Sequence, residues 1–258
     1  LFYLTARNTT QAAAEDALQR LHAGAPGLAL RSVTLTAKEK ACLCKDADGH
    51  PSCLPEVCPY AKGYFDRVKD ALASLLDGAP QFSRAVLEET ARQFTVCPFE
   101  LGLDLSAWCD VVIGDYNYLF DPVVRLHRFF DSAGDWLFLI DEAHNLPDRA
   151  RAMYSAQFSK SSLTEAKRTL GKGKSPLKAA LTRADKAFLE TRKQTAEQGG
   201  TAFLQELPAE LLKPLHALQA PLQDWLEQNP DTEAHAQLLD LYFAVQDITR
   251  AAERYDEH

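Results

Sequence analysis

The stretch WLFLIDEAHNLPD, residues 136–148, constrains the fold of this chain most, because a run of apolar strand formers ends in two adjacent carboxylates and a histidine. The four apolar side chains of residues 137–140 predict a fully buried strand of a parallel sheet. In α/β sheets, ligands bind at the carboxyl ends of the strands. We therefore expect an α/β fold in which Asp141 and Glu142 face a bound molecule.

The side chains that follow this strand have the chemistry needed for phosphate hydrolysis. Asp141 can hold Mg²⁺ through water, Glu142 can deprotonate a water that attacks a γ-phosphate, and His144 can report the state of the site to a neighbouring surface. The alternative is a buried strand followed by a capped helix whose acidic residues only complement the helix dipole. The whole string, with its NLPD exit, favours the catalytic interpretation.

Length and composition predict a globular protein. With 258 residues, of which 46% are hydrophobic, the chain is long enough for one to three domains. No apolar run approaches the roughly 18 residues that span a bilayer, and the first residues lack a signal-peptide pattern. We therefore expect a cytoplasmic protein without a membrane partner. The chain starts directly on the strand-like LFYL, from which we infer that it is part of something larger.

The formal net charge of −8 is unevenly distributed. Residues 1–200 are neutral, with 25 basic and 25 acidic side chains, whereas residues 201–258 have 3 basic and 11 acidic ones. Residues 160–193 contain ten basic side chains and three acidic ones. This basic region is compatible with nucleic-acid contact and equally with a solvated helix face.

Hydrophobic periodicity predicts alternating strands and helices, followed by a helical remainder. The predicted strands cover residues 2–5, 28–35 and 111–113. The predicted helices cover residues 11–22, with Thr9 or Thr10 as N-cap, then 65–76 and 83–94. Beyond about residue 147 we expect four or five helices, broken at Gly171–Gly173, Gly199–Gly200, Pro221 and Asn229–Pro230.

Five of the six cysteines fall within residues 42–97, which suggests a metal site rather than disulfides in a cytosolic α/β protein. Four thiolates can hold either a tetrahedral zinc or a 4Fe-4S cluster, and the wide spacing does not decide between them. Buried free cysteines that act as small hydrophobes are the alternative.

Four segments, in order, carry a family resemblance: LTAKEKACLC, CPYAKGYFDR, CPFELGLDLSAWCDVVIGDYNYLFDP and LIDEAHNL. Together they resemble the XPD/DinG family of iron-sulfur superfamily-2 DNA helicases. The resemblance implies a partial RecA-like motor domain with a cysteine-rich iron-sulfur insert and an α-helical arch domain. The implied domains are 1–35 and 104–149 for the two parts of the motor domain, 36–103 for the insert and 150–258 for the arch.

By the same resemblance, four cysteines would ligate a 4Fe-4S cluster. Carried over by position, the ligands are Cys42, Cys53, Cys58 and Cys97. Cys44 remains an alternative to Cys42, and Cys109 matches no ligand position. We expect residues 36–100 to become disordered when the metal is lost, because so small an insert has little core of its own.

The resemblance also implies contacts with DNA at three places. The expected DNA-contacting residues are Thr5, Arg7, Lys38, Lys40, Tyr116, Asn117 and Tyr118. A polar, cationic turn at a strand end suits phosphate, lysines suit phosphate or an anionic cluster, and exposed tyrosines suit base stacking. An ordinary βα turn, a solvated turn and packing tyrosines are the respective alternatives.

A motor also needs a GxxxxGKS or GxxxxGKT loop that cradles phosphates. The nearest match, RTLGKGKS at residues 168–175, fails because Arg168 replaces the first glycine and Pro176 follows the serine. We therefore expect ATP and Mg²⁺ to be bound by a longer parent protein and not by this piece alone.

The leading hypothesis is a fragment of an ATP-dependent 5′-to-3′ DNA helicase that acts on single-stranded and forked DNA, with a monomer as the expected state. The alternatives are a non-catalytic DNA-binding or interaction module and a zinc-stabilised structural domain.

Overall fold

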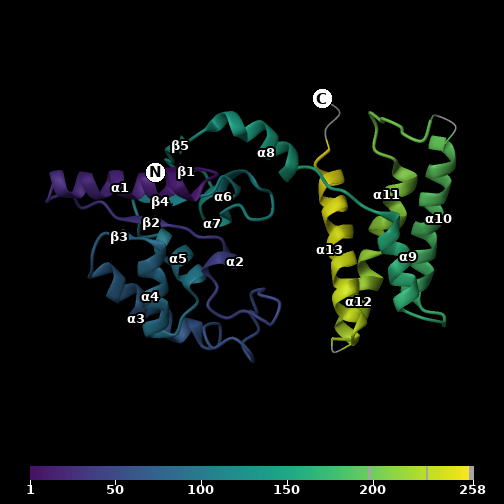
Figure 1. The fold of residues 1–258 in the computed structure, drawn as a ribbon, viewed down its shortest axis with the longest axis horizontal. Coiled ribbons are helices and arrows are strands. Elements are labelled where there is room, and N and C mark those ends of the chain that lie inside the picture. The colour runs from purple at the N-terminus through teal and green to yellow at the C-terminus, as the bar shows by residue number, and fades with distance from the viewer. Residues whose placement is uncertain (197–198, 231, 256–258) are drawn as a thin grey trace. The chain divides into compact units, whose positions relative to one another are not determined.

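Residues 1–196, 199–230 and 232–255 are described by the computed structural model of the chain. The chain divides into two compact units, Leu1–Ala150 and Arg151–His258 (Figure 1). Each unit has a hydrophobic core of its own. Within the described residues, no helix combines the length and the apolar character that crossing a bilayer requires.

The first unit is built on a five-stranded sheet with the order β3-β2-β4-β1-β5. All neighbouring strands run parallel, which confirms the predicted parallel α/β sheet. In the register, Phe2 lies between Val112 and Phe138. The strands are β1 (Phe2–Leu4), β2 (Ser32–Thr34), β3 (Gln81–Phe82), β4 (Val111–Gly114) and β5 (Phe138–Ile140).

Strand β5 lies at the edge of this sheet, and the prediction that it is fully buried is wrong. Leu137 is 71% exposed and Leu139 is 53% exposed. Among the described residues β5 pairs with β1 alone, so one edge and much of both faces stay uncovered. The strands that are largely buried are β4 and β1, because each of them has a neighbouring strand on both sides.

Helices cover the two faces of the sheet. On one face, Leu18 of α1 (Asn8–Gly24) packs against Val111 and Ile113 of β4. On the opposite face, Leu35, which follows β2, lies against Gly102 of α5 (Pro98–Ser106). Figure 1 shows the same layering, with α1 and α5 on either side of the strands.

The segment between β2 and β4 contains four helices and returns to the sheet once. The helices are α2 (Lys38–Ala41), α3 (Tyr64–Leu76), α4 (Arg84–Phe94) and α5. Strand β3 lies between α3 and α4 and pairs with β2. Ser83 caps α4 by accepting a hydrogen bond from the Val86 amide at 3.5 Å. The predicted insert 36–103 thus contributes one strand to the sheet.

An aromatic cluster packs on β1 beside the DEAH segment. The ring of Phe2 lies 5.0 to 5.8 Å from the rings of Phe129, Phe130, Trp136 and Phe138. Tilted and edge-on ring pairs at such distances stabilise a core beyond their buried area. The short elements around this cluster are α6 (Asn117–Phe120), α7 (His127–Phe130), the 3₁₀ turn Ala143–Asn145 and α8 (Leu146–Met153).

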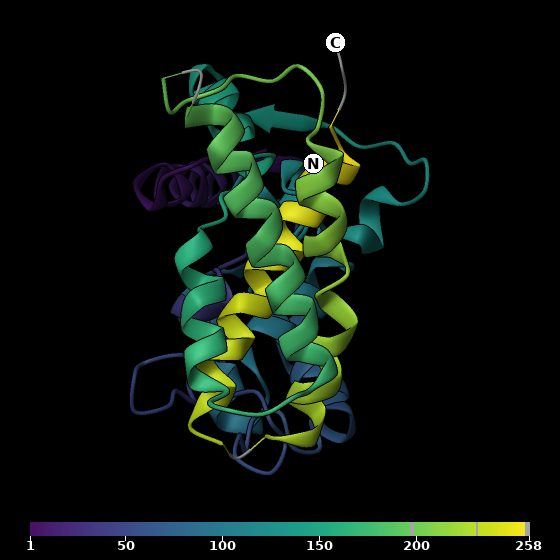
Figure 2. The ribbon, with the colours of Figure 1, turned by 90° about the vertical axis from the view of Figure 1, so that its right-hand side faces the viewer.

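The second unit is a bundle of helices around a core of leucine, alanine and valine (Figure 2). Its described helices are α9 (Lys160–Thr169), α10 (Pro176–Ala196), α11 (Ala209–His216), α12 (Gln219–Gln228) and α13 (Ala234–Glu253). Their number agrees with the predicted four or five. The predicted breaks at Gly171–Gly173, Gly199–Gly200 and Asn229–Pro230 lie between helices. Pro221 instead lies in the first turn of α12, where a helix tolerates proline.

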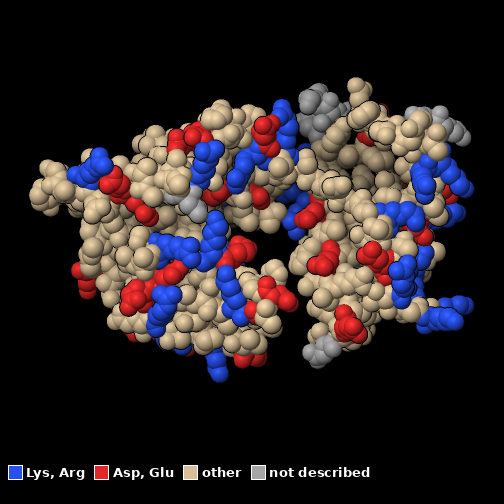
Figure 3. Space-filling model, in the orientation of Figure 1, with Lys and Arg blue, Asp and Glu red and all other residues tan. Residues whose placement is uncertain are grey.

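Polar side chains on the second unit are segregated by charge. Lys and Arg side chains gather over α10 and the turn before it (Figure 3). At the α9–α10 contact, Asp185 forms ion pairs with Lys160 at 2.7 Å and with Lys167 at 3.0 Å.

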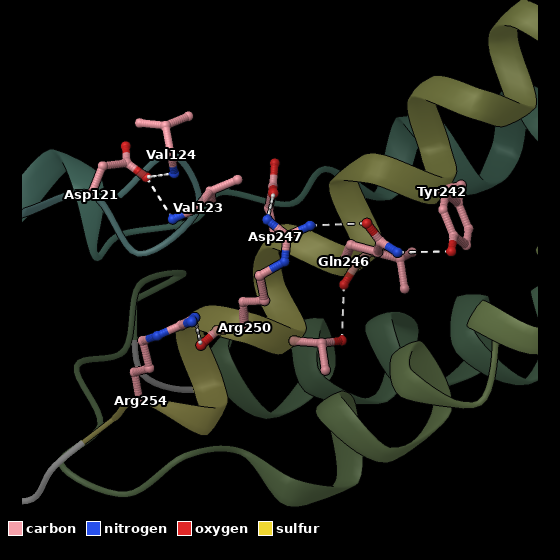
Figure 4. A network of polar contacts seen from close by, with 10 residues as sticks. Asp121, Val123, Val124, Tyr242, Gln246, Asp247, Arg250 and Arg254 are labelled. Carbon is pink, nitrogen blue, oxygen red and sulfur yellow. Dashed lines mark hydrogen bonds and ion pairs between the residues drawn. The ribbon is translucent and has the colours of Figure 1, made fainter. Parts of the chain in front are cut away.

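A row of hydrogen bonds runs along α13. The Gln246 side chain donates to the Tyr242 hydroxyl and accepts a hydrogen bond from Arg250, one turn further along the helix (Figure 4).

Candidate functional site

Strand β5 delivers Asp141 and Glu142 to the carboxyl end of the sheet, beside the end of β1. The Asp141 amide donates to the Leu4 carbonyl at 2.9 Å, so pairing with β1 continues one residue past β5. Glu142 then adopts a left-handed backbone with φ 48°, which is uncommon for a residue other than glycine. This conformation ends the strand and turns the chain into the 3₁₀ turn Ala143–Asn145.

Two tyrosines, one in β1 and one just after β4, hold Asp141. The Tyr3 hydroxyl donates to Asp141 Oδ2 at 3.1 Å, and the Tyr116 hydroxyl donates to the main-chain carbonyl of Asp141. Burial, followed by the bond to Asp141, raises the pKa of Tyr3, so its phenol keeps the proton that it donates. The carboxylate is therefore oriented, and its other lone pairs suit the waters around a Mg²⁺ ion.

Glu142 is fixed by the turn that it begins. The Asn145 side-chain amide donates to Glu142 Oε2 at 3.1 Å, and the Asn145 main-chain amide donates to the Glu142 carbonyl at 3.0 Å. Glu142 is half-buried and His144 is exposed. A carboxylate held in this way can accept a proton from a nearby water. Asn145 was not predicted as a site residue, although its spacing of three from Glu142 was the available signal.

The two tyrosines after β4 are packing residues. Tyr116 is 0% exposed and Tyr118 is 8% exposed. The Tyr118 ring lies over Gly114, where a Cβ atom would come within 2.8 Å of it. These positions correct the expectation that Tyr116 and Tyr118 stack on bases, because a buried ring presents no face to a base.

Arg149 of α8 connects the DEAH exit to the segment after β4. Its Nη2 atom donates to Asp115 Oδ1 at 2.7 Å and to Asn117 Oδ1 at 2.9 Å. The guanidinium also lies over the ring of Tyr116, with Cζ 5.8 Å from the ring centroid. The main-chain nitrogen of Asn117 donates to the same Asp115 oxygen at 2.9 Å. Sequence reasoning missed Arg149 because its partners lie more than 30 residues away.

A pocket of about 810 Å³ opens at the carboxyl ends of β2 and β4, and we call it the basic pocket. Its lining includes four residues that the sequence predicted as DNA contacts: Lys38, Lys40, Asn117 and Tyr118. Further cationic lining residues, missed by sequence reasoning, are Arg84, Arg125 and Arg128. Its acidic lining residues are Glu15, Glu39 and Asp115. The excess of cationic groups suits a ligand with phosphates.

Several cations of the basic pocket also have protein partners. Arg84 donates to the Lys40 carbonyl at 2.7 Å, and Arg128 donates to the Leu103 carbonyl at 2.6 Å. Such bonds hold a guanidinium in place while part of its fork stays available for a ligand.

Thr5 and Arg7 do not line the basic pocket. Thr5 is 1% exposed and shares its hydroxyl hydrogen bond with Thr10, so its hydroxyl is not presented to a phosphate. Arg7 is exposed and is the N-cap residue of α1. This position corrects the predicted cap at Thr9 or Thr10, because the Thr10 hydroxyl donates to the Arg7 carbonyl at 2.8 Å and caps no amide.

Five cysteines lie near the end of α2 and before the starts of α3 and α5. The Cys44 thiol interacts with Cys58 and with the more distant Cys42 and Cys53, and loss of solvation followed by these contacts raises the pKa of Cys44. Cys97 starts α5, and burial raises its pKa. The thiol donor set suits zinc or an iron-sulfur cluster. Among the described residues, no three or more metal-binding side chains converge on a common ion position.

Lys38 lies against these cysteines. Burial lowers the pKa of Lys38, but a hydrogen bond to Cys53 and the nearby Glu100 and Cys97 raise it overall. A cation in this place would stabilise thiolates once they form. Lys38 therefore links the cysteine segment to the basic pocket, whose lining it shares.

Arg67 joins the segments that carry Cys58 and Cys97. Its guanidinium donates to the carbonyls of Pro59 and Lys62, which follow Cys58, at 3.2 and 2.6 Å. The same group donates to the carbonyl of Thr95 at 2.7 Å, two residues before Cys97. One side chain thus fixes the spacing of two predicted ligands.

Cys109 stands apart from the cysteine group. Its thiol donates to the Leu105 carbonyl at 3.4 Å, and burial raises its pKa to about 12. A thiol that resists deprotonation is a poor metal ligand.

Comparisons with known proteins identify the family to which the chain belongs. The sequence matches the DEAD_2 family over residues 5–163. It is 32% identical over 84 residues to the Fanconi anemia group J protein homolog of Gallus gallus, covering 33% of this chain and 7% of that protein. It is 27% identical over 84 residues to the general transcription and DNA repair factor IIH helicase subunit XPD of Schizosaccharomyces pombe, covering 33% of this chain and 11% of that protein.

The fold is also found among solved structures. A structure described as truncated XPD superposes with a TM-score of 0.51 at 15% sequence identity, covering 98% of this chain and 69% of that one. The parallel sheet with a DEAH box at a strand end, together with the match to the DEAD_2 family, places the chain in the superfamily-2 helicase class. Within that class the chain belongs to the DEAD_2 family and is a fragment of the XPD/DinG type. It spans about a tenth or less of the length of the two curated relatives.

Proposed function

We propose that the chain is part of the first motor domain of an ATP-dependent DNA helicase that moves 5′ to 3′. The observation that carries this proposal is the oriented pair Asp141 and Glu142 at the carboxyl end of a parallel sheet. Membership of the DEAD_2 family supports it further. In the parent protein, a phosphate-cradling loop outside residues 1–258 would hold ATP.

Each carboxylate has a distinct role in the proposed reaction. Asp141, oriented by Tyr3, would hold Mg²⁺ through water, and the ion would neutralise charge on the β- and γ-phosphates. Glu142, oriented by Asn145, would accept the proton of the attacking water. The exposed His144 would contact a neighbouring surface and report the state of the nucleotide.

The test of this proposal is ATP hydrolysis by the full-length parent protein. We expect Glu142→Gln to retain ATP binding and lower kcat by about 10²- to 10⁴-fold, the usual contribution of a general base. Glu165→Gln, an exposed substitution on α9, is the matched control and should leave kcat unchanged. Equal turnover of Glu142→Gln and the native protein would contradict the proposal. A parent without a phosphate-cradling loop would favour a non-catalytic DNA-binding module.

We further propose that the cysteine group holds a 4Fe-4S cluster, with Cys53, Cys58 and Cys97 as three of the ligands. The interactions of Lys38 with Cys53 and Cys97 support this proposal, as do the bonds of Arg67 to carbonyls near Cys58 and Cys97. The fourth ligand is Cys42, with Cys44 as the alternative that its contact with Cys58 supports. The cluster would serve mainly to make rigid a wedge at which duplex DNA is parted.

Metal analysis of protein purified without oxygen tests the cluster. We expect a brown protein that contains iron, whose broad visible absorbance is lost in Cys58→Ser and kept in Cys109→Ser. Comparing Cys42→Ser with Cys44→Ser identifies the fourth ligand, because only the variant that removes a ligand loses iron. A colourless protein with stoichiometric zinc would contradict the cluster and favour a zinc-stabilised domain.

We propose that single-stranded and forked DNA binds at the basic pocket through Lys38, Lys40 and Asn117. The volume of the pocket and its excess of cations support this. Arg7, exposed at the start of α1, would add a phosphate contact. Neutralising Lys38 and Lys40 should weaken binding in the parent protein and flatten its salt dependence by about 0.7 per lost contact. Lys69→Gln, exposed on α3, serves as the control.

The remaining assignments are proposals of the same kind. Residues 1–35 and 104–149 would form the two parts of the motor domain, residues 36–103 the insert and residues 150–258 the arch. The parent would act as a monomer in the cytoplasm, and cysteines that form no disulfide are compatible with that reducing compartment.

A further inference from the structure

The segment 115–117 lies between the DEAH carboxylates and the basic pocket. Asp115 and Asn117 belong to the lining of the basic pocket. Tyr116, between them in the sequence, turns to the other side and donates its hydroxyl to the carbonyl of Asp141. Three consecutive residues thus contact the basic pocket and Asp141, so a shift of this segment moves groups at both sites.

Arg149 forms a second connection between the DEAH turn and the segment 115–117. It belongs to α8, the helix that leaves the DEAH turn, and binds Asp115 and Asn117 through one nitrogen. The Arg149 and Asp115 side chains are 34% and 32% exposed, so their ion pair is partly shielded from solvent. The same guanidinium covers the Tyr116 ring. Helix α8 is therefore bonded to two residues that line the basic pocket.

The contacts that join α8, residues 115–117 and Asp141 leave little room for independent movement. Tyr116 is fully buried, and close-packed side chains transmit displacement because they have no room to rearrange. A ligand that draws Asn117 into the basic pocket must therefore break its bond to Arg149 or move α8. In the second case, the carbonyl of Asp141 and the turn at Glu142 move as well.

We propose that Arg149 and Tyr116 are positioning residues that couple occupancy of the basic pocket to the DEAH carboxylates, so that bound nucleic acid raises the rate of ATP hydrolysis. The inference rests on the proposed function and adds to it the residues that carry the coupling. Neither residue needs to touch ATP or nucleic acid. Their effect would come from the placement of Asp141 and Glu142 when the pocket is filled.

The experiment measures ATP turnover and DNA affinity in the full-length parent protein. For Arg149→Met we expect a basal kcat within about twofold of the native value and a DNA-stimulated kcat that falls roughly tenfold, which is a typical size of coupling between sites. The Kd for a single-stranded oligonucleotide should change little. Arg149→Lys should recover most of the stimulation, because one ammonium group can reach both oxygens that Nη2 binds. Arg20→Met, exposed on α1, is the matched control.

A second variant separates coupling from folding. Tyr116→Phe removes only the hydroxyl that binds Asp141 and keeps the buried volume. It should lower stimulation at saturating DNA, and the double variant with Arg149→Met should lose no more than the larger single loss, because both residues act in one connection. Full DNA stimulation of kcat in both single variants would overturn the inference. A loss of stimulation that is explained by a weaker Kd for DNA would overturn it as well. A native parent whose ATPase ignores DNA would instead contradict the proposed function itself.

Discussion

At the scale of single residues, a few long side chains fix the positions of several chain segments at once. Arg67 is the clearest case, since it satisfies the carbonyls of Pro59, Lys62 and Thr95 in a part of the chain with little regular structure. A planar fork of five donors can hold several carbonyls in fixed directions, whereas a lysine has three donors on a flexible stem and a methionine has none. The geometry of the cysteine group therefore depends on a residue that ligates nothing.

We predict that Arg67→Met lowers the iron content of the purified protein and raises amide exchange in residues 58–62, because the carbonyls of Pro59, Lys62, Phe94 and Thr95 lose their donor. The measurements are iron per chain and hydrogen-deuterium exchange. Arg92→Met is the control, because Arg92 pairs only at the surface with Glu88. Native iron content in Arg67→Met would show that the cysteines hold their spacing without it.

Asp185 leads to a pH-dependent prediction in the second unit. Hydrogen bonds from Lys160 and Lys167 hold the pKa of Asp185 below its usual value. Its contribution to stability is thus present above the unfolded pKa of about 4 and is lost as pH falls through the lower folded value. Asp185→Asn should reduce the free energy of unfolding by roughly 1 to 2 kcal/mol at pH 7.

Urea unfolding at pH 7 and pH 3 checks this prediction. The difference between the native chain and Asp185→Asn should shrink at pH 3, where the Asp185 side chain of the unfolded chain takes up a proton. Asp224→Asn, exposed on α12, is the control and should show no difference at either pH. An equal loss at both pH values would mean that the charge of Asp185 contributes nothing.

At the scale of elements, the cysteine-bearing region has two parts of different stability. Helices α3, α4 and α5 pack together around buried Leu75, Leu87, Ala91 and Leu101. Residues 42–63 contain no helix or strand longer than the isolated bridge between Lys45 and Pro51. The helices have a core that does not involve a metal, whereas the connecting segment has none.

We therefore predict that removing the metal exposes residues 42–63 to protease and leaves α3, α4 and α5 protected, instead of disordering all of residues 36–100. Limited proteolysis with mass spectrometry, with and without a chelator, locates the cuts. Cleavage throughout 64–106 in the metal-free protein would show that the helices depend on the metal too.

Sequence patterns predicted the elements well and their surroundings poorly. The strand before Asp141 was predicted because apolar runs are local, but its edge position depends on partners that no local pattern encodes. Strand β3 consists of Gln81 and Phe82 and is too short to have a period. Among site residues, the carboxylates follow from a motif. Arg149 and Arg67 act through contacts distant in sequence, so only the structure identifies them.

At the scale of the whole molecule, the uncovered strand β5 is the feature that most affects behaviour in solution. Leu137 and Leu139 are exposed, and within the part of the chain that the structure describes the outer edge of β5 pairs with no strand, so β5 offers a template for another strand. We predict that residues 1–258 associate at high concentration and that Leu139→Lys reduces this association. Sedimentation velocity over a concentration series measures it, with Leu189→Lys on α10 as a control at another exposed leucine. An unchanged distribution for Leu139→Lys would place the contact elsewhere.

The left-handed backbone at Glu142 also implies a compromise between thermal stability and the proposed catalytic role. A residue with a Cβ atom in this region loses about 1 kcal/mol relative to glycine. Glu142→Gly would relieve that strain and remove the proposed proton acceptor, whereas Glu142→Gln would keep the strain without the base. If the glycine variant melts at a higher temperature than the glutamine variant, the native chain gives up some thermal resistance to keep a carboxylate at this turn.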